Sequence, residues 1–169
     1  MRKLWQLTAL CWVLAAQAEP PGLENFHRVS PTLYRGAQPT AEGMKQLERL
    51  GVKTVINLRS FHTDNVELSG THLRREHLWV KTWHPEDEDV RRFLQIVTDT
   101  NATPVFVHCQ HGSDRTGTMV AIYRIVVEGW TKDKAIAEMT TGGFGYHRVW
   151  KNLPQYIRDL DTDKLTTTR

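Results

Sequence analysis

The sequence predicts a single α/β domain with a mainly parallel central sheet flanked by helices. Short apolar runs of strand length alternate along the chain with longer runs in which apolar residues recur at helical spacing. Such alternation favours strand–helix–strand units, in which the returning helix makes successive strands parallel. With 169 residues, 40% hydrophobic and 24% charged, the chain can bury one sizeable core. No internal repeat or second domain is evident.

The first half of the domain is expected to contain most of the strands. Residues 28–35 mix apolar residues with turn formers and predict a pair of short strands. Thr40 has the side chain of a helix N-cap. The apolar residues that follow it on one helical face are Met44, Leu47 and Leu50. The apolar run Val52–Leu58 then predicts a buried strand, and Leu73–Thr82 predicts another after a polar loop.

The second half is expected to contain one further strand and four helices. The first helix is indicated by the stripe Val90, Phe93, Leu94 and Val97. The wholly apolar run Pro104–His108 predicts a short buried strand. Thr116–Glu128 is apolar on nearly all sides, which is typical of a buried central helix, and Gly129 ends it. Another helix is expected from Thr131 to Met139. The last helix has its apolar stripe at Trp150, Leu153, Ile157 and Leu160.

The first 18 residues predict a secretory signal peptide. They begin with Arg2 and Lys3, continue with the apolar run Leu4–Ala15 and end in Ala16-Gln17-Ala18, a small-x-small cleavage pattern. The apolar run is shorter than the roughly 20 residues of a membrane-spanning helix. We therefore expect an exported protein, periplasmic or secreted, with no stable membrane anchor after cleavage.

The remaining chain divides into three expected parts. Residues 19–27 are rich in proline and are expected to form a flexible lead-in. The α/β domain is expected at residues 28–162, and residues 163–169 are expected to form a C-terminal tail.

Charge and histidine spacing exclude two classes of partner. The chain has 22 basic and 19 acidic residues, and two of the basic residues belong to the signal peptide, so the two signs nearly balance afterwards. No block of Lys and Arg indicates a nucleic-acid-binding face. The eight histidines form no pair at a recognised metal-ligand spacing. We therefore predict no nucleic-acid partner, no metal site and no cofactor.

Cysteine usage singles out Cys109. The chain has two cysteines, and Cys11 lies in the predicted signal peptide. An exported protein with one remaining thiol cannot form an internal disulfide. A leftover thiol is a liability in an oxidising compartment unless it has a chemical role, which argues against an inert buried cysteine.

The ten residues His108–Gly117 carry the strongest chemical signal in the chain. They place Cys109 and Arg115 six positions apart around a loop that follows a predicted strand and precedes a predicted helix. The free N–H groups of such a loop can surround a tetrahedral anion, and the helix N-terminus adds partial positive charge. Gly112 permits the tight curvature. The residues expected to bind a phosphate group are Gln110, His111, Gly112, Ser113, Asp114 and Arg115.

This loop predicts the cleavage of phosphoesters by nucleophilic catalysis. The positive field favours the thiolate form of Cys109, which is placed for in-line attack on phosphorus and formation of a phosphocysteine. The planar fork of Arg115 matches two phosphate oxygens and stabilises the transition state with the loop amides. The Thr116 hydroxyl can donate to the sulfur when it leaves. His108 is expected to orient the loop, because the attack requires no base.

The motif resembles the His-Cys-x5-Arg-Thr-Gly signature of the protein tyrosine phosphatase superfamily, in its dual-specificity branch. The resemblance extends over roughly residues 28–160. Three further segments resemble exported bacterial dual-specificity phosphatases: residues 30–39, residues 55–59 and Gly142-Gly143-Phe144-Gly145. The resemblance implies a small, metal-independent enzyme that acts on phosphotyrosine and sometimes on phosphoserine or phosphothreonine.

The residue that protonates the leaving group is expected on a loop ahead of the cysteine. Asp87 is the first choice, since it precedes the helical stripe and leaves Asp89 to cap that helix. Glu86 and His84 are alternatives, because the acid of the family commonly lies further ahead of the following helix. The acidic residues of this segment could instead only complement the helix dipole.

Other residues bear on the pocket and its substrate. Arg59 ends a strand at the edge where α/β folds bind ligands; a surface ion pair is its expected role, and contact with the phosphate is the alternative. Tyr146 and His147 follow a glycine-rich segment and are candidates for the pocket border. The negative charge of Asp114 disfavours polyphosphate ligands, so phosphoproteins rank above phosphoinositides or other small phosphomonoesters.

Two other classes of protein use part of this motif. A non-catalytic phosphate-binding module would suit a chain lacking the cysteine or the arginine, and both are present. A thiol-redox or sulfur-transfer protein would favour a resolving cysteine or a shorter loop between Cys109 and Arg115. The sequence therefore predicts a cysteine-dependent phosphatase.

Overall fold

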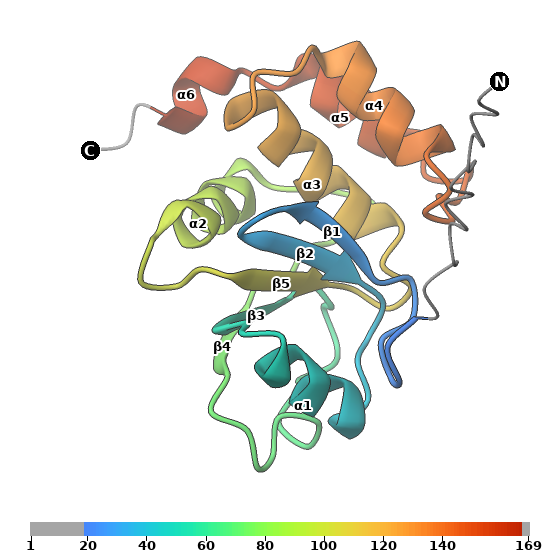
Figure 1. Ribbon diagram of the computed structural model, residues 1–169. Coiled ribbons are helices and arrows are strands. Elements are labelled where there is room, and N and C mark those ends of the chain that lie inside the picture. The colour runs from blue at the N-terminus through green and yellow to red at the C-terminus, as the bar shows by residue number, and fades with distance from the viewer. Residues whose placement is uncertain (1–18, 167–169) are drawn as a thin grey trace, which may run out of the picture.

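The computed structural model describes residues 19–166, so the signal peptide predicted at residues 1–18 lies outside the described part of the chain. Within that part, a five-stranded sheet carries helices on both faces (Figure 1). The strands are β1 (His27–Ser30), β2 (Leu33–Gly36), β3 (Thr54–Asn57), β4 (Arg74–His77) and β5 (Val105–His108). The helices are α1 (Ala41–Arg49), α2 (Asp87–Thr98), α3 (Asp114–Val126), α4 (Lys132–Thr141), α5 (Asn152–Asp159) and α6 (Thr162–Thr166).

The strand order β1-β2-β5-β3-β4 confirms the predicted fold class. β1 and β2 are antiparallel, and the other three neighbouring pairs are parallel. The register places Gly36, Asn57 and His108 side by side at the ends of β2, β3 and β5. Because the carboxyl ends of parallel strands share one edge of the sheet, the segments that follow these three strands meet there.

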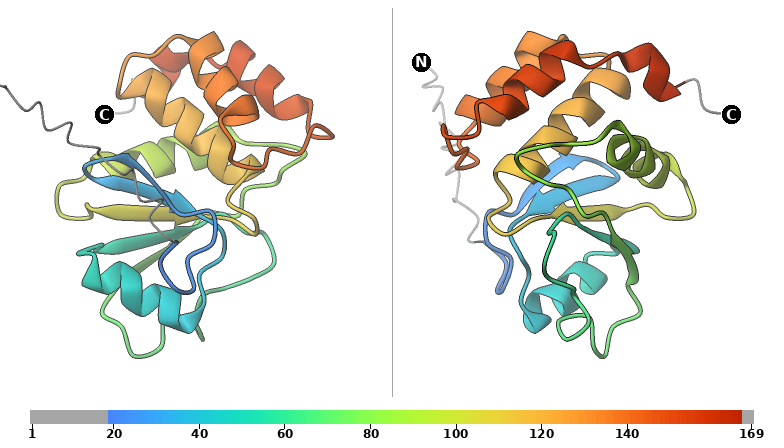
Figure 2. Two further views of the ribbon diagram at one scale, coloured as in Figure 1. Left: turned by 45° about the vertical axis from the view of Figure 1, so that its right-hand side comes forward. Right: turned by 180° about the vertical axis from the view of Figure 1, so that it is seen from behind.

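The two faces of the sheet are covered by different helices. Val55 and Phe106 pack with Met44 of α1 in one apolar cluster. Ile56 and Val107, their neighbours along the strands, belong to the larger cluster on the opposite face, as the period of two in a strand requires. The view from behind shows α1 on one side of the sheet and α2 and α3 on the other (Figure 2).

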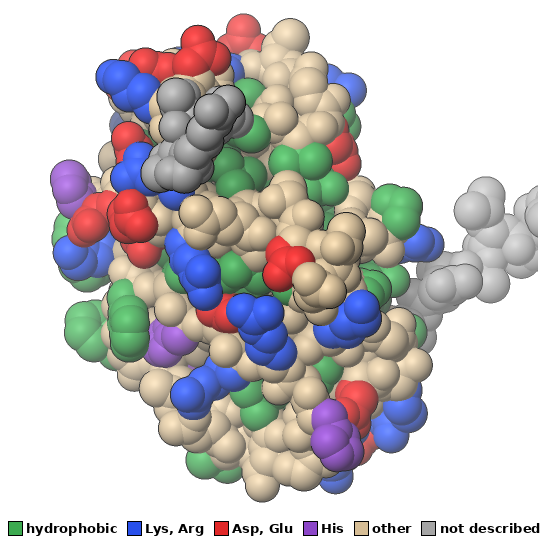
Figure 3. All heavy atoms as spheres, turned by 90° about the vertical axis from the view of Figure 1, so that its left-hand side faces the viewer, with side chains coloured by type: hydrophobic (Ala, Val, Ile, Leu, Met, Phe, Trp, Pro, Cys, Tyr) green, Lys and Arg blue, Asp and Glu red, His purple; other side chains and the backbone are tan. Residues whose placement is uncertain are grey.

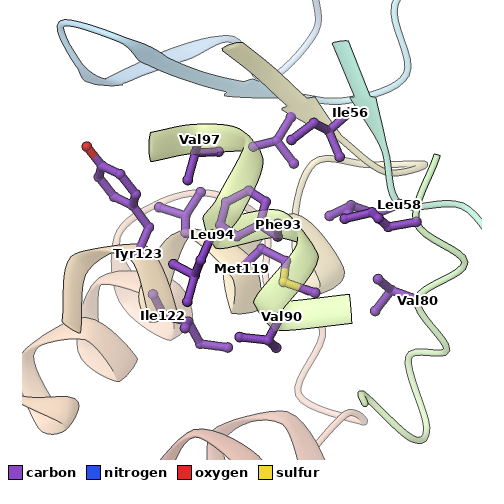
Figure 4. Packing of buried hydrophobic residues seen from close by; sticks show 14 of the residues in the cluster. Ile56, Leu58, Val80, Val90, Phe93, Leu94, Val97, Met119, Ile122 and Tyr123 are labelled. Atoms are coloured by element: carbon purple, nitrogen blue, oxygen red, sulfur yellow. The ribbon is translucent and has the colours of Figure 1, made fainter. Parts of the chain in front are cut away.

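Helix α3 is the centre of the larger layer, as its nearly continuous apolar character predicted. Helices α2, α4 and α5 all pack against it, and residues 116–123 are buried without interruption. Figure 4 shows side chains from α2 (Phe93), α3 (Met119) and the sheet (Ile56) converging in this layer. Because α3 is surrounded in this way, its N-terminus is held in a fixed place. The loop that begins at Cys109 ends there.

The helix starts were predicted with mixed success. The Thr40 and Thr131 hydroxyls cap α1 and α4 by accepting hydrogen bonds from the third residue of each helix, at 3.1 and 3.3 Å. The prediction that Asp89 caps α2 was wrong. This helix begins at Asp87 after the N-cap Glu86, and three acidic residues of its first turn complement the helix dipole instead of a side-chain cap.

The expected flexible lead-in is in fact part of the fold. Leu23 is 1% exposed and packs in the apolar cluster under α1. The carbonyls of Gly22 and Glu24 accept hydrogen bonds from Thr40 and Ala37, at 3.1 and 2.9 Å. The proline content suggested a loose segment, but one buried leucine and these backbone bonds anchor it.

Other segments also differ from the expectation. Leu50 follows α1 and is 47% exposed, so it does not extend the apolar face. The strand expected over Leu73–Thr82 ends at His77. The expected tail begins with the short helix α6, in which Leu165 is buried against the core.

The surface in the view of Figure 3 carries charges of both signs, with Lys and Arg side chains interspersed among Asp and Glu. Ion pairs also join neighbouring elements, such as Arg124 of α3 and Glu138 of α4 at 2.9 Å. Within residues 19–166, no helix combines the length and the apolar character needed to cross a bilayer.

Candidate active site

The loop Cys109–Arg115 lies between the end of β5 and the first turn of α3, at the edge where β2 and β3 also end. Cys109 has a free thiol and is 3% exposed. Gly112 adopts a positive φ of 69°. A β-carbon there would lie 2.7 Å from the amide nitrogen of Ala37 and closer still to the carbonyl of Gly36. Only glycine allows the loop to turn this tightly against β2.

A buried arginine holds the inner side of this loop. Arg35 of β2 is 1% exposed, and its Nη2 donates a hydrogen bond to the carbonyl oxygen of Gly112 at 2.7 Å. The ring of Phe144 lies 4.0 Å from the guanidinium carbon. Burial lowers the pKa of Arg35 to about 10, against opposing effects of Glu138 and Cys109. Because the Gly112 carbonyl faces this cation, it cannot face an anion on the other side of the loop.

A buried carboxylate holds the other side of the loop. The Nε2–H of His108 donates to Asp64 Oδ2 at 2.9 Å, and both side chains are completely buried. Asp64 also accepts hydrogen bonds from Gln38 and Asn57, at 2.9 and 3.0 Å. Burial raises the pKa of Asp64, but the bonds from His108 and Gln38 outweigh it, so the pKa lies below its ordinary value. The contacts of His108 fit the predicted loop-orienting role.

Two arginines border the space beside the loop. The Nη1 group of Arg115 donates to the carbonyl of Leu58 at 3.4 Å. Arg59 does not form the expected surface ion pair with any described residue; its Nη1 donates to Gln38 Oε1 at 2.9 Å instead. Burial and the nearby Arg115 lower the pKa of Arg59. The two cations therefore face the same space.

This space is a pocket of about 480 Å³. Its polar lining consists of Arg59, Ser60, Thr82, Gln110, His111, Asp114, Arg115 and His147. Its apolar lining consists of Phe61, Trp83, Val149 and Trp150. Three of the apolar side chains are well exposed, namely Phe61, Trp83 and Val149. The pocket is therefore cationic beside the loop and aromatic toward its rim.

Asp114 and His147 form a pair at this pocket. Asp114 Oδ2 accepts from His147 Nδ1 at 2.8 Å, and Oδ1 accepts from the His147 backbone N–H at 2.9 Å. The sequence made Tyr146 and His147 candidates for the pocket border; His147 lines the pocket, and Tyr146 is not among the lining residues. Both carboxylate oxygens of Asp114 accept hydrogen bonds from His147, which leaves the carboxylate its negative charge, so the repulsion of polyphosphates stays a prediction.

Known proteins are similar to this chain in sequence. The family described as "DSP-PTPase phosphatase fused to NAD+ Kinase" matches residues 22–149. The chain is 40% identical over 151 residues to the dual specificity protein phosphatase TpbA of Pseudomonas aeruginosa strain UCBPP-PA14, covering 89% of this chain and 68% of that protein. The chain belongs to the dual-specificity branch of the protein tyrosine phosphatase superfamily.

Solved structures agree with this assignment. The crystal structure of P. aeruginosa TpbA matches with a TM-score of 0.78 at 39% identity, over 88% of this chain and 92% of that one. A cysteine-to-serine variant of TpbA in complex with pTyr matches with a TM-score of 0.77 at 38% identity, over 88% and 91%. The present chain is thus a cysteine-dependent phosphatase.

The phosphatase places its predicted acids outside the pocket lining. Asp87 Oδ1 accepts a hydrogen bond of 2.7 Å from the hydroxyl of Tyr156 in α5, and burial together with this bond raises the pKa of Tyr156. Glu86 pairs with Lys81 at 3.0 Å. His84 is exposed. None of the three acids lines the pocket, and the role of Asp87 stays a prediction.

Two other observations concern residues near the loop. The Thr116 hydroxyl is buried and has no hydrogen-bond partner among the described residues, so its donation to sulfur stays a prediction. The sequence indicated no metal site, whereas His62, Asp64 and Glu67 bring ligand atoms within 4.8 Å of one another. Because Asp64 already accepts three hydrogen bonds, this group is explained by the network behind the loop.

Sequence reasoning missed Arg35, Gln38 and Asp64 as supports of the site. Arg35 and Gln38 stand in the segment that carries the family resemblance, which was the one available signal. Asp64 lies in a polar loop, and no local pattern distinguishes it from solvated acids.

We predict that Gly112→Ala abolishes vanadate binding, because the added β-carbon collides with the backbone of β2. Gly129→Ala is the matched control: Gly129 also has a positive φ, of 71°, but a β-carbon there meets nothing within 4 Å. The control should lose only about 1–2 kcal/mol of stability and keep its affinity. Calorimetric titration with vanadate and thermal unfolding measure both effects. Equal losses of vanadate affinity in the two variants would contradict the close approach.

We predict a pH-dependent stability difference between the wild type and Asp64→Asn. The ordinary pKa of 3.8 for Asp64 is lowered by folding, so the ionised carboxylate stabilises the folded state above that value. The wild type should be more stable than the variant by about 1.5–3 kcal/mol at neutral pH. This difference in the free energy of unfolding should shrink as the pH falls below about 4 and then through the lowered pKa of Asp64. Urea unfolding across this range measures it, and a constant difference would refute the assigned charge.

Proposed function

We propose that this phosphatase hydrolyses phosphotyrosine esters of proteins through a phosphocysteine intermediate, with phosphoserine and phosphothreonine as further candidate substrates. The aromatic rim of the pocket carries this proposal. Phe61, Trp83 and Trp150 line the space beside the cationic loop, where an aryl ring can pack against other rings while its phosphate reaches the loop. The structure of the TpbA variant in complex with pTyr supports the same substrate class.

The reaction follows from the positions of Cys109 and Arg115. The thiolate of Cys109 attacks phosphorus, the S–P bond forms, and the bond from phosphorus to the tyrosyl oxygen breaks. The loop amides and Arg115 stabilise the charge that gathers on the non-bridging oxygens. Water then attacks the phosphocysteine, the S–P bond breaks, and inorganic phosphate and the thiolate are released. No step requires a metal ion or a cofactor.

A second candidate substrate class is favoured by Arg59. Its guanidinium lies in the same pocket as Arg115, so the pocket offers two cations. A phosphoinositide or another small phosphomonoester with a second anionic group would use both. The aromatic rim has no role for such a ligand, which is why we rank phosphotyrosine first.

We expect the protein comprising residues 19–169 to hydrolyse a phosphotyrosine peptide in the presence of a chelator. Cys109→Ser should lose all measurable turnover, because it removes the nucleophile. Arg115→Lys should lose about 100-fold or more, because an ammonium cannot match two phosphate oxygens. Phosphate release measures turnover.

Arg49→Lys is the matched control for the arginine variant, since Arg49 pairs with Glu42 on the exposed side of α1. It should retain full activity. Normal turnover by Cys109→Ser would overturn the mechanism. Faster cleavage of phosphoinositides than of phosphotyrosine peptides would transfer the proposal to the second substrate class.

We also propose that residues 1–18 direct export and are removed after Ala18, leaving a periplasmic or secreted enzyme whose sole thiol is Cys109. The three-part pattern of these residues supports this. Full-length chain expressed in a bacterium should yield a periplasmic or secreted protein that begins at Glu19. Fractionation and N-terminal sequencing measure this. Uncleaved chain in the cytosol would refute it.

A further inference from the structure

Cleavage of phosphotyrosine leaves a negative charge on the tyrosyl oxygen, and a proton donor is needed there. The acids expected from the sequence make other contacts: Asp87 with Tyr156 and Glu86 with Lys81. Among the residues that line the pocket, the one carboxylate, Asp114, is bound to His147. The other side chains of the pocket are therefore also candidates for the donor.

The Asp114–His147 pair gives the imidazole a defined orientation. His147 Nδ1 donates to Asp114 Oδ2 at 2.8 Å, so Nε2 is the ring nitrogen left to exchange a proton. The second bond, from the His147 backbone N–H to Oδ1, fixes the residue at a second point. Asp114 immediately precedes the phosphate-binding Arg115, and its partner His147 lines the same pocket with a side chain 49% exposed. The His147 ring therefore lies next to the loop Cys109–Arg115 and is accessible to a substrate.

The segment that carries His147 is anchored on both sides. Before it, the Phe144 ring lies on the guanidinium of Arg35, and the Phe144 carbonyl accepts a hydrogen bond of 3.1 Å from Asn25. After it, the Trp150 N–H donates to the His147 carbonyl at 3.0 Å. These contacts hold the backbone of the histidine in a fixed relation to the loop.

The charged and titratable groups around the ring come from three elements. Asp114 of α3 contacts it directly, and the His111 ring of the loop lies 5.5 Å away, measured between centroids. Arg115, at the start of α3, and Arg59, after β3, line the same pocket. A histidine that donates a proton has to be an imidazolium, and Asp114 supplies the anion next to it.

We propose that His147, oriented by Asp114, is the general acid of this phosphatase. This assignment rests on the phosphotyrosine activity proposed above. As the S–P bond forms, the P–O bond breaks and its electron pair leaves with the tyrosyl oxygen, which takes the proton from Nε2 of His147. In the second step the neutral ring takes a proton from the attacking water as the S–P bond breaks. The imidazolium and the Cys109 thiolate are both restored, so protons and electrons balance over the cycle.

The test is the dependence of kcat on the basicity of the leaving group in His147→Gln. Basic leaving groups need the proton and acidic ones do not. For phenyl phosphate and a phosphotyrosine peptide, the variant should lose about 100-fold or more in kcat, with a much smaller loss for dinitrophenyl phosphate. The basic limb of the pH–rate profile should disappear. His72→Gln, at an exposed histidine paired with Glu48, is the control and should behave as the wild type.

A second variant and the rival acids keep the test decisive. In Asp114→Asn, kcat should also depend steeply on the basicity of the leaving group, but less steeply than in His147→Gln. This variant provides the test if circular dichroism shows that His147→Gln is unstable. Wild-type dependence in both variants would overturn the proposal, and so would a steep dependence confined to Asp87→Asn, Glu86→Gln or His84→Gln. If the proposed function is wrong, the wild type cleaves no aryl phosphate. If only the role of His147 is wrong, dinitrophenyl phosphate is still hydrolysed and its hydrolysis requires Cys109.

Discussion

The active site depends on burying a charged group on each side of the loop Cys109–Arg115. Arg35 draws the Gly112 carbonyl inward, and Asp64 fixes His108 at the start of the loop. Both charges are costly to bury. Asp64 accepts three hydrogen bonds, whereas Arg35 has its bond to Gly112 and the ring of Phe144 against its guanidinium, and its Nε has no hydrogen-bond partner among the described residues. Because the Gly112 carbonyl is bound to Arg35, it does not compete with the N–H groups of the loop for an anion. The loop is therefore held by two buried residues, Arg35 and Asp64, that do not line the pocket.

The same principle explains how charge is distributed at the pocket. The start of α3, Arg115 and Arg59 all bring positive character to one place. The single carboxylate of the lining, Asp114, is bound to His147 by two hydrogen bonds. An approaching phosphate thus meets cations and amides, while the aromatic rim receives the group that carries it. The proposed anion site and the proposed site for the leaving group are thus separate parts of one pocket.

The fold was predictable because its signals are local. The apolar strands, the Thr40 and Thr131 caps and the all-round apolar character of α3 each arise within one segment. The errors occurred where a distant contact outweighs local composition. Leu23 anchors a proline-rich segment by packing under α1, and Leu165 secures a helix in an expected tail. Asp89 looked like a cap only because the sequence did not reveal where α2 begins.

By itself, the sequence determined the α/β class and predicted Cys109 as the nucleophile and Arg115 as the phosphate-binding residue, because the strand, loop and helix that carry them are consecutive. Only the tertiary structure decided which residues support and surround them. Along the chain, Arg35, Asp64 and His147 lie 74, 45 and 38 positions from Cys109. The spacing of side chains along the sequence carries no record of contacts over such separations. Packing of the sheet edge brings these groups together, and that is where the chemistry beyond the signature loop resides.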